Sequence, residues 1–243
     1  MPNNTFNGAL SCDVLDHGFV ALHNISGPNP VKDVSERFCA HDRDPANCAR
    51  MSFNAMDTRS LEEDMKLAEY LMKHKHTTPF EMVEIWLEMK LPIFVARQFV
   101  RHRTVSINEV SARYVQLPAE WYIPEVVGAK PDKAKQGQTA KLEIAMQDSF
   151  RASLDFVCTK SYASYVRYLE SGVAPEHARL FLHVNHYTHW MWKQDLHNMM
   201  HFLSLRADSH AQVEAQAYAL AIIELLKTAL PETMKLFDEY RRN

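Results

Sequence analysis

The spacing of apolar side chains along the chain predicts a protein built mostly from helices. After Ser60 apolar residues recur at helical spacing, and Ser60 and Glu63 have the spacing of a capping box. Gly172 suits the end of a long helix, and Pro92 suits the first turn of another. The pattern predicts helices over 61–74, 93–102, 140–171, 175–182, 195–206 and 209–230, and a last helix that opens at Pro231.

A second pattern, the alternation of apolar and polar residues, predicts a few strands. Residues 83–91 alternate in the way that is typical of a half-buried strand. Residues 14–26 are rich in β-branched and apolar side chains, and 120–124 form a shorter run of the same kind, so both are predicted strands. Loops are predicted over 27–54, with one short helix, over 103–114 with no regular pattern, and over 128–141 as an exposed segment.

The order of these elements indicates the fold class. Strands and helices do not alternate as they do in βαβ units, so a parallel sheet is not expected. We predict an α+β fold that is mostly helical, with a small, mainly antiparallel sheet, and a single domain over residues 1–243.

Composition narrows the class of protein. The 243 residues have 47% hydrophobic side chains and a formal net charge of −3, the proportions of an ordinary globular protein and not of a nucleic-acid coat. The chain has no apolar run of the roughly 20 residues that a membrane span needs. Cys12, Cys39, Cys48 and Cys158 form no C-x-x-C pair, and no signal peptide is evident, so we expect a cytoplasmic protein with reduced thiols.

Candidate chemistry is concentrated in residues 97–114. This segment holds four arginines and one glutamate, so its charge is 4 − 1 = +3, and the rest of the chain carries −3 − 3 = −6. Arginine guanidinium groups bind phosphate and carboxylate in bidentate fashion, which favours a local anion site. Two simpler interpretations stay open at this point: surface arginines on a solvated helix, and a non-catalytic nucleotide- or RNA-binding module.

The same segment resembles a known enzyme family. Residues 101–114 read RHRTVSINEVSARY, which is similar to the signature of the flavin-dependent thymidylate synthases. Residues 205–212, LRADSHAQ, resemble the family's C-terminal block. The resemblance covers roughly residues 49–124 and 174–225, and includes ARMSF at 49–53, HTTPFE at 76–81, PIFVARQ at 92–98 and EHARLFL at 176–182.

The resemblance implies a flavoprotein methyltransferase of nucleotide biosynthesis. Such an enzyme methylates C5 of dUMP to form dTMP, takes the carbon from methylenetetrahydrofolate, and takes the hydride from reduced FAD, which NADPH replenishes. It also implies a homotetramer whose active sites are each built by several subunits.

The resemblance assigns site residues position by position. Arg206 is the implied catalytic residue, because a guanidinium near N3 and O4 of uracil would stabilise the negative charge that develops there. The positions that match dUMP contacts are Gln98, Phe99, Val100, Arg101, Glu109, Val110, Ser111, Ala112, Arg113, Arg179 and Arg206. The positions that match FAD contacts are Thr78, Arg101, His102, Arg103, Glu109, Asp195, His197 and His201.

Two further residue types bear on the mechanism. None of the four cysteines lies in the signature or in the C-terminal block, which agrees with a route that uses no thiolate, and Ser111 has no neighbouring base that would make it a nucleophile. His183, His186 and His189 are spaced by three, but no H-E-x-x-H or paired Asp/His motif occurs. We therefore expect no metal, and a metal-dependent phosphohydrolase is the weaker alternative.

Overall fold

A computed structural model describes residues 4–6, 8–28, 41–56, 58–131, 138 and 140–242. Its centre is one six-stranded sheet with the strand order β1-β2-β3-β4-β6-β5. Every neighbouring pair is antiparallel, which confirms the predicted sheet type. The strands are β1 Asn4–Phe6, β2 Ala9–Val14, β3 Gly18–Ser26, β4 Glu84–Pro92, β5 Ser106–Glu109 and β6 Tyr187–Asp195.

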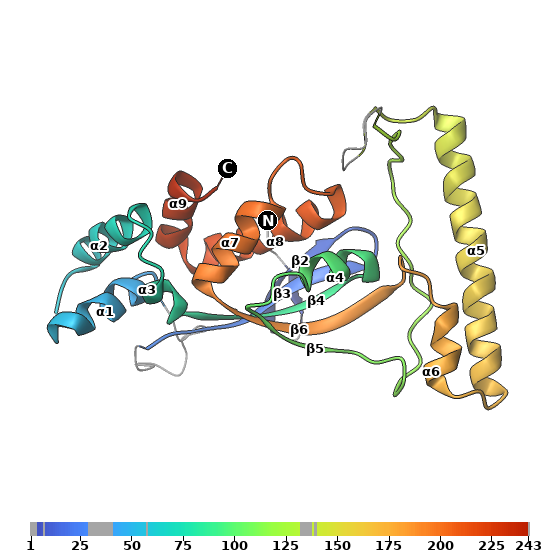
Figure 1. Cartoon of the computed structure of the whole chain (residues 1–243), viewed down its shortest axis with the longest axis horizontal. Coiled ribbons are helices and arrows are strands. Elements are labelled where there is room, and N and C mark those ends of the chain that lie inside the picture. The colour runs from blue at the N-terminus through green and yellow to red at the C-terminus, as the bar shows by residue number, and fades with distance from the viewer. Residues whose placement is uncertain are drawn as a thin grey trace.

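Helices cover one face of this sheet, and other helices lie beyond both of its ends (Figure 1). Helices α4, α7 and α8 lie over the sheet, α1 to α3 and α9 gather at one end, and α5 with α6 forms an arm at the other. No helix in the described part of the chain is long and apolar enough to cross a membrane. The helices are α1 Asp44–Arg50, η1 Met51–Phe53, α2 Leu61–Lys73, α3 Thr78–Glu81, α4 Ile93–Phe99, α5 Ile144–Glu170, α6 Pro175–Ala178, η2 Arg179–Phe181, α7 Leu196–Arg206, α8 Val213–Ala229 and α9 Pro231–Tyr240.

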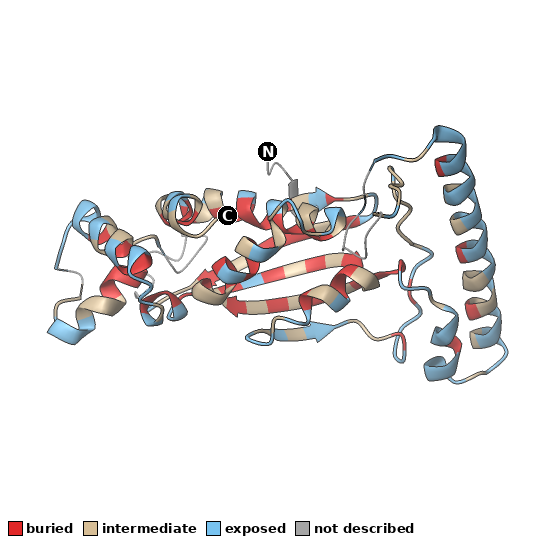
Figure 2. Ribbon diagram, turned by 45° about the horizontal axis from the view of Figure 1, so that its top comes forward, coloured by how far each residue is buried: buried red, intermediate tan, exposed pale blue. Residues whose placement is uncertain are grey.

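The core lies between the sheet and the helices above it. Figure 2 shows buried residues along the central strands and on the helix faces turned toward them. Phe99 of α4 sits at the centre, in edge-to-face contact with Trp192, Phe202 and Tyr218 at centroid distances of 6.2, 4.8 and 6.3 Å. Burying a side chain of this size contributes about 1.5–3 kcal/mol. The core therefore fixes α4, β6 and α7 relative to one another.

Local signals predict several elements correctly. Helix α2 begins with the predicted capping box, in which Ser60 accepts from the Glu63 backbone and Glu63 accepts from the Ser60 backbone. Strand β4, the long helix α5 and the helices α7, α8 and α9 also lie where the pattern predicts them, with ends shifted by a few residues. The predicted loop 128–141 falls partly outside the described residues, which omit 132–137 and 139.

The predicted strand over 14–26 is wrong as a single strand. The chain turns after Val14, and Gly18 opens β3 directly opposite Val14, so the segment is part of a hairpin. Leu15 takes up the left-handed conformation in this turn, with φ of 60°. An apolar residue at a turn hides the break in the pattern, because turns usually carry Gly, Asn or Asp there.

Four other predictions need correction, and one strand is not predicted. The predicted strand over 120–124 is only an isolated bridge between Trp121 and His186. The helix predicted over 93–102 ends at Phe99, and the one predicted over 175–182 is a short helix followed by a 3₁₀ turn. The predicted irregular segment 103–114 contains the edge strand β5, and β6 is a strand that the pattern does not predict at all.

Candidate active site

The signature segment runs from the end of α4 into the edge strand β5. Glu109 lies opposite Trp190, and Ile107 lies opposite Trp192. Because paired residues of antiparallel strands point to the same side, both side chains face the helix-covered side of the sheet. There the Thr188 hydroxyl donates to the Glu109 carboxylate at 2.5 Å. This contact fixes the carboxylate of Glu109 against β6.

Arg206 is the last residue of α7, and its guanidinium reaches the end of α4. Its Nε donates to Nε2 of His102 at 3.2 Å, and its Nη2 donates to the backbone carbonyl oxygen of Gln98 at 3.4 Å. Neither acceptor is charged. Burial lowers the pKa of Arg206 from its ordinary value. The group is thus held in one direction and keeps a positive charge that no carboxylate of the described chain neutralises.

His102 is half-buried against the aromatic core. Its ring meets Phe202 edge-on with a centroid distance of 5.0 Å and lies 6.3 Å from the ring of His201. Burial, followed by the charges of Arg206 and His201, lowers the pKa of His102 to about 4. The imidazole is therefore neutral at physiological pH, and its Nε2 can accept a hydrogen bond from the Nε–H group of Arg206.

The other arginines of the signature segment also lack carboxylate partners. Within the described part of the chain, the side chains of Arg101 and Arg103 make no hydrogen bond or ion pair, and Arg113 contacts only Tyr114, with its guanidinium carbon 5.3 Å from the ring centroid. Two arginines elsewhere are paired with a carboxylate: Arg43 and Arg50 each lie 2.9 Å from Asp64. The free guanidinium groups suit the phosphates of a nucleotide or of FAD.

Gln98 connects the two sequence blocks. Its side-chain amide nitrogen donates to the side-chain oxygen of Gln212 at 2.5 Å, while its backbone carbonyl oxygen accepts from Arg206. Gln216 in turn donates to the carbonyl oxygen of Asp208 at 3.0 Å, which holds the segment between α7 and α8. Gln212 is not among the predicted site residues, although it lies inside the block 205–212 that signals the site.

Ser111 belongs to a turn and has no activating base. Its hydroxyl accepts from the backbone N–H of Arg113 at 3.3 Å, and its carbonyl oxygen accepts from Tyr114 at 2.9 Å. Val110 donates to the carbonyl oxygen of His189 at 2.8 Å, and Ala112 is buried. This geometry supports a binding role for the turn and gives no support to a serine nucleophile.

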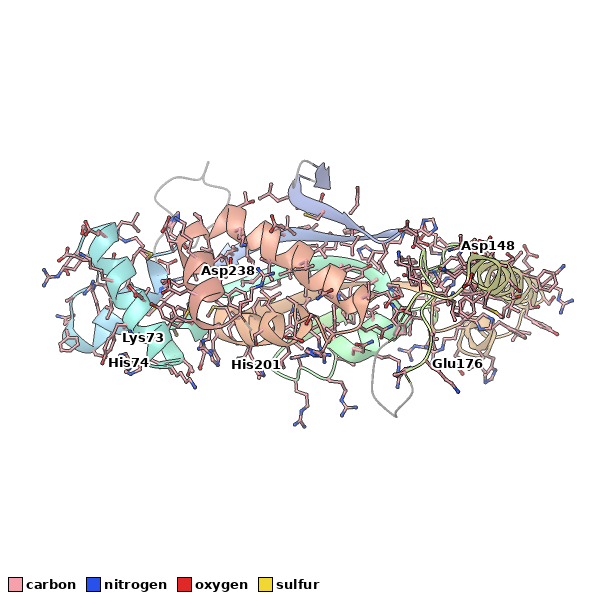
Figure 3. All side chains as sticks on the ribbon, turned by 90° about the horizontal axis from the view of Figure 1, so that it is seen from above. Lys73, His74, Asp148, Glu176, His201 and Asp238 are labelled. Atoms are coloured by element: carbon pink, nitrogen blue, oxygen red, sulfur yellow. The ribbon has the colours of Figure 1, made fainter. Side chains whose placement is uncertain are left out.

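Three of the predicted flavin positions lie along α7. Asp195 caps the helix by accepting from the backbone and the side-chain amide of Asn198, both at 2.8 Å. His197 is half-buried with an unpartnered Nδ1, and burial lowers its pKa. His201 follows one turn later on the exposed side of the helix (Figure 3). Helix α3, which begins at Thr78, packs against α7, so these positions form one band that leads toward Arg206.

Arg179 is the predicted site residue that the fold places elsewhere. It lies in η2, beside α5 in the arm, and its exposed side chain forms no hydrogen bond or ion pair within the described part of the chain. Glu176, three residues earlier, lies at the arm end of the molecule, far from His201 (Figure 3). Within one chain, Arg179 therefore belongs to the arm, whereas Arg206 ends α7, which lies over the sheet.

The cavity next to Asp195 is small. It has a volume of about 120 Å³, below the roughly 300–1,000 Å³ of small-molecule sites. Gln194, one of its walls, donates to Thr104 at 3.4 Å and accepts from Trp192 at 3.3 Å. A cavity of this size is too small to enclose a flavin or a nucleotide. The cavity is lined by Glu84, Thr104, Val105, Ser106, Lys193, Gln194 and Asp195.

The three evenly spaced histidines do not form a cluster. His186 is buried and stacks on Tyr162 with an interplanar angle of 13°. Nε2 of His189 donates to one carboxylate oxygen of Glu88 at 2.6 Å, and Nε2 of His23 donates to the other at 2.5 Å. In the described ranges, no three His, Cys, Asp or Glu side chains are placed to hold a metal ion.

The cysteines lie away from this site. Cys12 is on β2, Cys48 on α1 and Cys158 on α5, all with free thiols, and Cys39 is outside the described residues. Burial raises the pKa of all three, in the case of Cys48 to about 11. Thiols of this kind are poor nucleophiles at neutral pH.

Comparison with known proteins decides the family. A family model described as "Thymidylate synthase complementing protein" matches residues 36–232. The chain belongs to this family. The match runs through residues 125–173, which the motif resemblance leaves out.

Named relatives of the family are similar over most of their length. The chain is 42% identical over 237 residues to the flavin-dependent thymidylate synthase of Gluconobacter oxydans (strain 621H), an alignment that spans 94% of this chain and 73% of the relative. It is also 42% identical to the flavin-dependent thymidylate synthase of Thermus thermophilus, over 96% and 80% of the two chains.

A solved structure has the same fold. The crystal structure of a UMP/dUMP methylase from Streptomyces cacaoi, bound with 5-Br dUMP, superposes with a TM-score of 0.79 at 27% sequence identity. The superposition covers 96% of this chain and 99% of that chain. These relatives are enzymes, so the non-catalytic nucleotide- or RNA-binding alternative gains no support.

Proposed function

We propose that the protein is a flavin-dependent thymidylate synthase that methylates C5 of dUMP to form dTMP. The carbon donor is methylenetetrahydrofolate, and NADPH is the reductant. The observation that carries the proposal is the guanidinium of Arg206, held by two uncharged acceptors next to arginines that have no carboxylate partner. Membership of the family and the names of its relatives agree with it.

The phosphate of dUMP is assigned to the signature turn. Arg101 and Arg113 supply free guanidinium groups, and Ser111 and the backbone of Ala112 lie in the same turn. A phosphate dianion on a protein surface needs several donors, because each lost contact with water has to be replaced. The full set of dUMP positions is Gln98, Phe99, Val100, Arg101, Glu109, Val110, Ser111, Ala112, Arg113, Arg179 and Arg206. Phe99 would contribute through its backbone, because its side chain is buried in the core.

Arg206 is assigned to the uracil ring. When C5 attacks the one-carbon unit, electron density moves through N3 and O4, and the fixed guanidinium stabilises that charge. The partly dehydrated setting of Arg206 strengthens the interaction, because screening by water is reduced. A single well-placed donor of this kind is worth about 3–4 kcal/mol in a transition state.

The band along α3 and α7 is assigned to FAD, which supplies the hydride when bound. The unpaired guanidinium groups fit its pyrophosphate, and Glu109, fixed by Thr188, is an acceptor for hydroxyl or ring N–H groups. Asp195 keeps its capping role for α7, so its free acceptor capacity is reduced. The residues that would hold FAD are Thr78, Arg101, His102, Arg103, Glu109, Asp195, His197 and His201.

We assign the protein to a homotetramer in which subunits share active sites. Arg179 supports this arrangement, since it matches a nucleotide position but lies in η2, which packs against α5 of the arm. Helix α5 supports it too: only Gln147, Cys158 and Tyr165 of its 27 residues are buried, while Phe150 and Phe156 are exposed. Exposed apolar side chains on one helix are typical of a subunit interface.

A direct test uses the purified protein with FAD, dUMP, methylenetetrahydrofolate and NADPH. We expect a yellow protein that retains FAD through gel filtration, oxidises NADPH faster when dUMP is present, and forms dTMP. Protein that is folded by circular dichroism but neither binds FAD nor forms dTMP would contradict the proposal. Binding of RNA with steep salt dependence, in place of turnover, would support the non-catalytic alternative.

A further inference from the structure

We propose that His102 is a positioning residue that directs Arg206 through a neutral imidazole. The proposal rests on the proposed function, in which Arg206 acts on the uracil ring. His102 matches a flavin position by resemblance, and its bond to Arg206 gives it a second and different role.

The hydrogen bond itself defines the tautomer. The Nε of an arginine is always a donor, so Nε2 of His102 must be the acceptor in the 3.2 Å contact. An imidazole that accepts at Nε2 and is neutral carries its proton on Nδ1. The bond to Nε and the bond from Nη2 to the carbonyl oxygen of Gln98 occupy one edge of the guanidinium. The remaining N–H groups of Arg206 are left for a ligand.

The surroundings of His102 keep it in this form. Phe202 and His201 approach from α7, with centroid distances of 5.0 and 6.3 Å, and the guanidinium of Arg206 faces the same ring. On the α4 side, the backbone N–H of His102 donates to Phe99 at 2.9 Å, which anchors the residue where the helix ends. Burial and two neighbouring basic groups oppose protonation, so the acceptor persists across the neutral range.

An uncharged acceptor suits the reaction better than a carboxylate. A carboxylate at this position would hold Arg206 equally well but would offset its charge, as Asp64 offsets part of the charge of Arg43 and Arg50. The imidazole fixes the direction of the guanidinium and leaves its charge for N3 and O4 of uracil. Unlike the carboxylate of an ordinary ion pair, the imidazole of His102 orients the guanidinium of Arg206 and does not neutralise its charge.

The test compares three substitutions at one position. His102→Gln keeps a neutral acceptor of similar reach, His102→Phe keeps a ring without an acceptor, and His102→Glu introduces a carboxylate. We expect His102→Gln to stay within roughly 5-fold of the wild-type kcat, and the Phe and Glu variants to lose roughly 100-fold in kcat. KM for dUMP and the affinity for FAD should change much less.

Separate outcomes overturn the inference. Equal kcat in all FAD-saturated variants, or a loss confined to FAD affinity, would leave His102 as a flavin contact only. If His102→Phe does not fold, the Gln and Glu variants still test the inference, because both keep an acceptor for Arg206 and only Glu adds a negative charge. A readout independent of turnover is ¹⁵N NMR of labelled histidine, in which His102 should be the neutral Nδ1–H tautomer from pH 5.5 to 8. Inactive wild type would refute the proposed function, whereas an imidazolium or the Nε2–H tautomer would refute this inference alone.

Discussion

At the scale of single residues, Arg43 and Arg50 differ from Arg206 in their partners, because the first two lie beside a carboxylate and Arg206 does not. Asp64 is fully buried and receives both Arg43 and Arg50, so its carboxylate offsets one of the two positive charges, and the two ion pairs stabilise the packing of α1 against α2. Arg206 has only uncharged partners. A half-buried cation that is oriented but not neutralised costs folding free energy, and such an arrangement is typical of a functional site.

Replacing Arg206 with alanine should therefore reduce turnover far more than stability. We expect kcat to fall by roughly 100- to 1000-fold, because the donor at the uracil ring is lost. The melting temperature should change by only a few degrees, since no carboxylate is left unpaired. Steady-state kinetics and calorimetry measure both quantities.

Two controls sharpen the result for Arg206. Arg206→Lys keeps the charge but cannot make the two fixed contacts, so it should recover little activity. Arg59→Ala removes an exposed arginine whose partner is Glu63 on the surface of α2, and it should leave turnover unchanged. Normal dTMP formation by Arg206→Ala would show that the catalytic assignment is wrong.

The buried histidines predict how stability depends on pH. Burial is the main cause of the lowered pKa of His102, His186 and His197, and the value for His102 is about 4 against an ordinary 6.5. Between these pH values the unfolded chain binds protons that the folded chain does not. Stability should therefore fall as pH decreases from about 6.5 toward about 4.

Calorimetric melting temperatures at pH 7, 6 and 5 measure this slope. The variant His102→Gln cannot take up the proton in the unfolded state, so its melting temperature should fall less steeply than that of the wild type. A melting temperature that does not change over this range, or an unchanged slope in the variant, would contradict the explanation.

At the scale of elements, the sequence predicts what local patterns determine. The capping box of α2 and the alternation of β4 depend on neighbours in the chain, and both elements form as predicted. Strand β6 escapes prediction because its buried positions include Thr188 and Gln194 as well as Trp190 and Trp192. Those two polar side chains are buried because Glu109 and Thr104 provide hydrogen-bond partners, and no local pattern reveals such partners.

The same distinction holds for the candidate site. The signature residues of 101–114 can be named from the sequence because they follow one another along the chain. The contacts that give them a role join residues about 100 positions apart: His102 with Arg206, and Gln98 with Gln212. Only the packing of α4 against β6 and α7 produces these pairs, so sequence patterns could not supply them.

The hairpin that the pattern predicts as one strand gives a test of packing. A Cβ atom on Gly18 would lie 2.0 Å from the hydroxyl oxygen of Tyr218 and 2.7 Å from the carbonyl oxygens of Val14 and Lys90. The two carbonyl oxygens belong to paired strands and cannot move away. Gly18→Ala should lower the free energy of unfolding by about 3 kcal/mol.

Chemical denaturation measures that loss, and Tyr218 provides the control. Tyr218→Phe removes one of the close atoms and also the 2.7 Å hydrogen bond to the carbonyl oxygen of Lys90, so alone it should cost about 1 kcal/mol. The double variant should remain unstable, because both backbone contacts persist. A stable Gly18→Ala protein would mean that the hairpin is packed differently.

At the scale of the whole molecule, the proposed binding residues lie in two separate places. The sheet with α4 and α7 holds Arg206, and the arm formed by α5 and α6 leads to Arg179. The proposed tetramer reconciles these places by letting the arm of one subunit reach the sheet of another. The assignment of residues 1–243 to a single domain stays a prediction.

Subunit mixing tests this arrangement. Arg179→Ala and Arg206→Ala should each be nearly inactive alone, but a co-expressed mixture should form sites that contain both native arginines. Random assembly with two contributing subunits gives about a quarter of the sites in native form, so roughly that share of wild-type activity is expected. A mixture as inactive as either parent would show that one subunit supplies both residues.

Strand β5 links the signature to the energetics of binding. It has four residues, lies at the edge of the sheet, and pairs in the described structure only with β6. A short strand held by one ladder opens at a lower free energy than the central strands, so its amide protons should exchange earlier. Because Glu109 is in place only when this strand is closed, closure and ligand binding form one coupled equilibrium. A nucleotide that binds through Glu109 should therefore increase the fraction of molecules in which β5 is paired with β6.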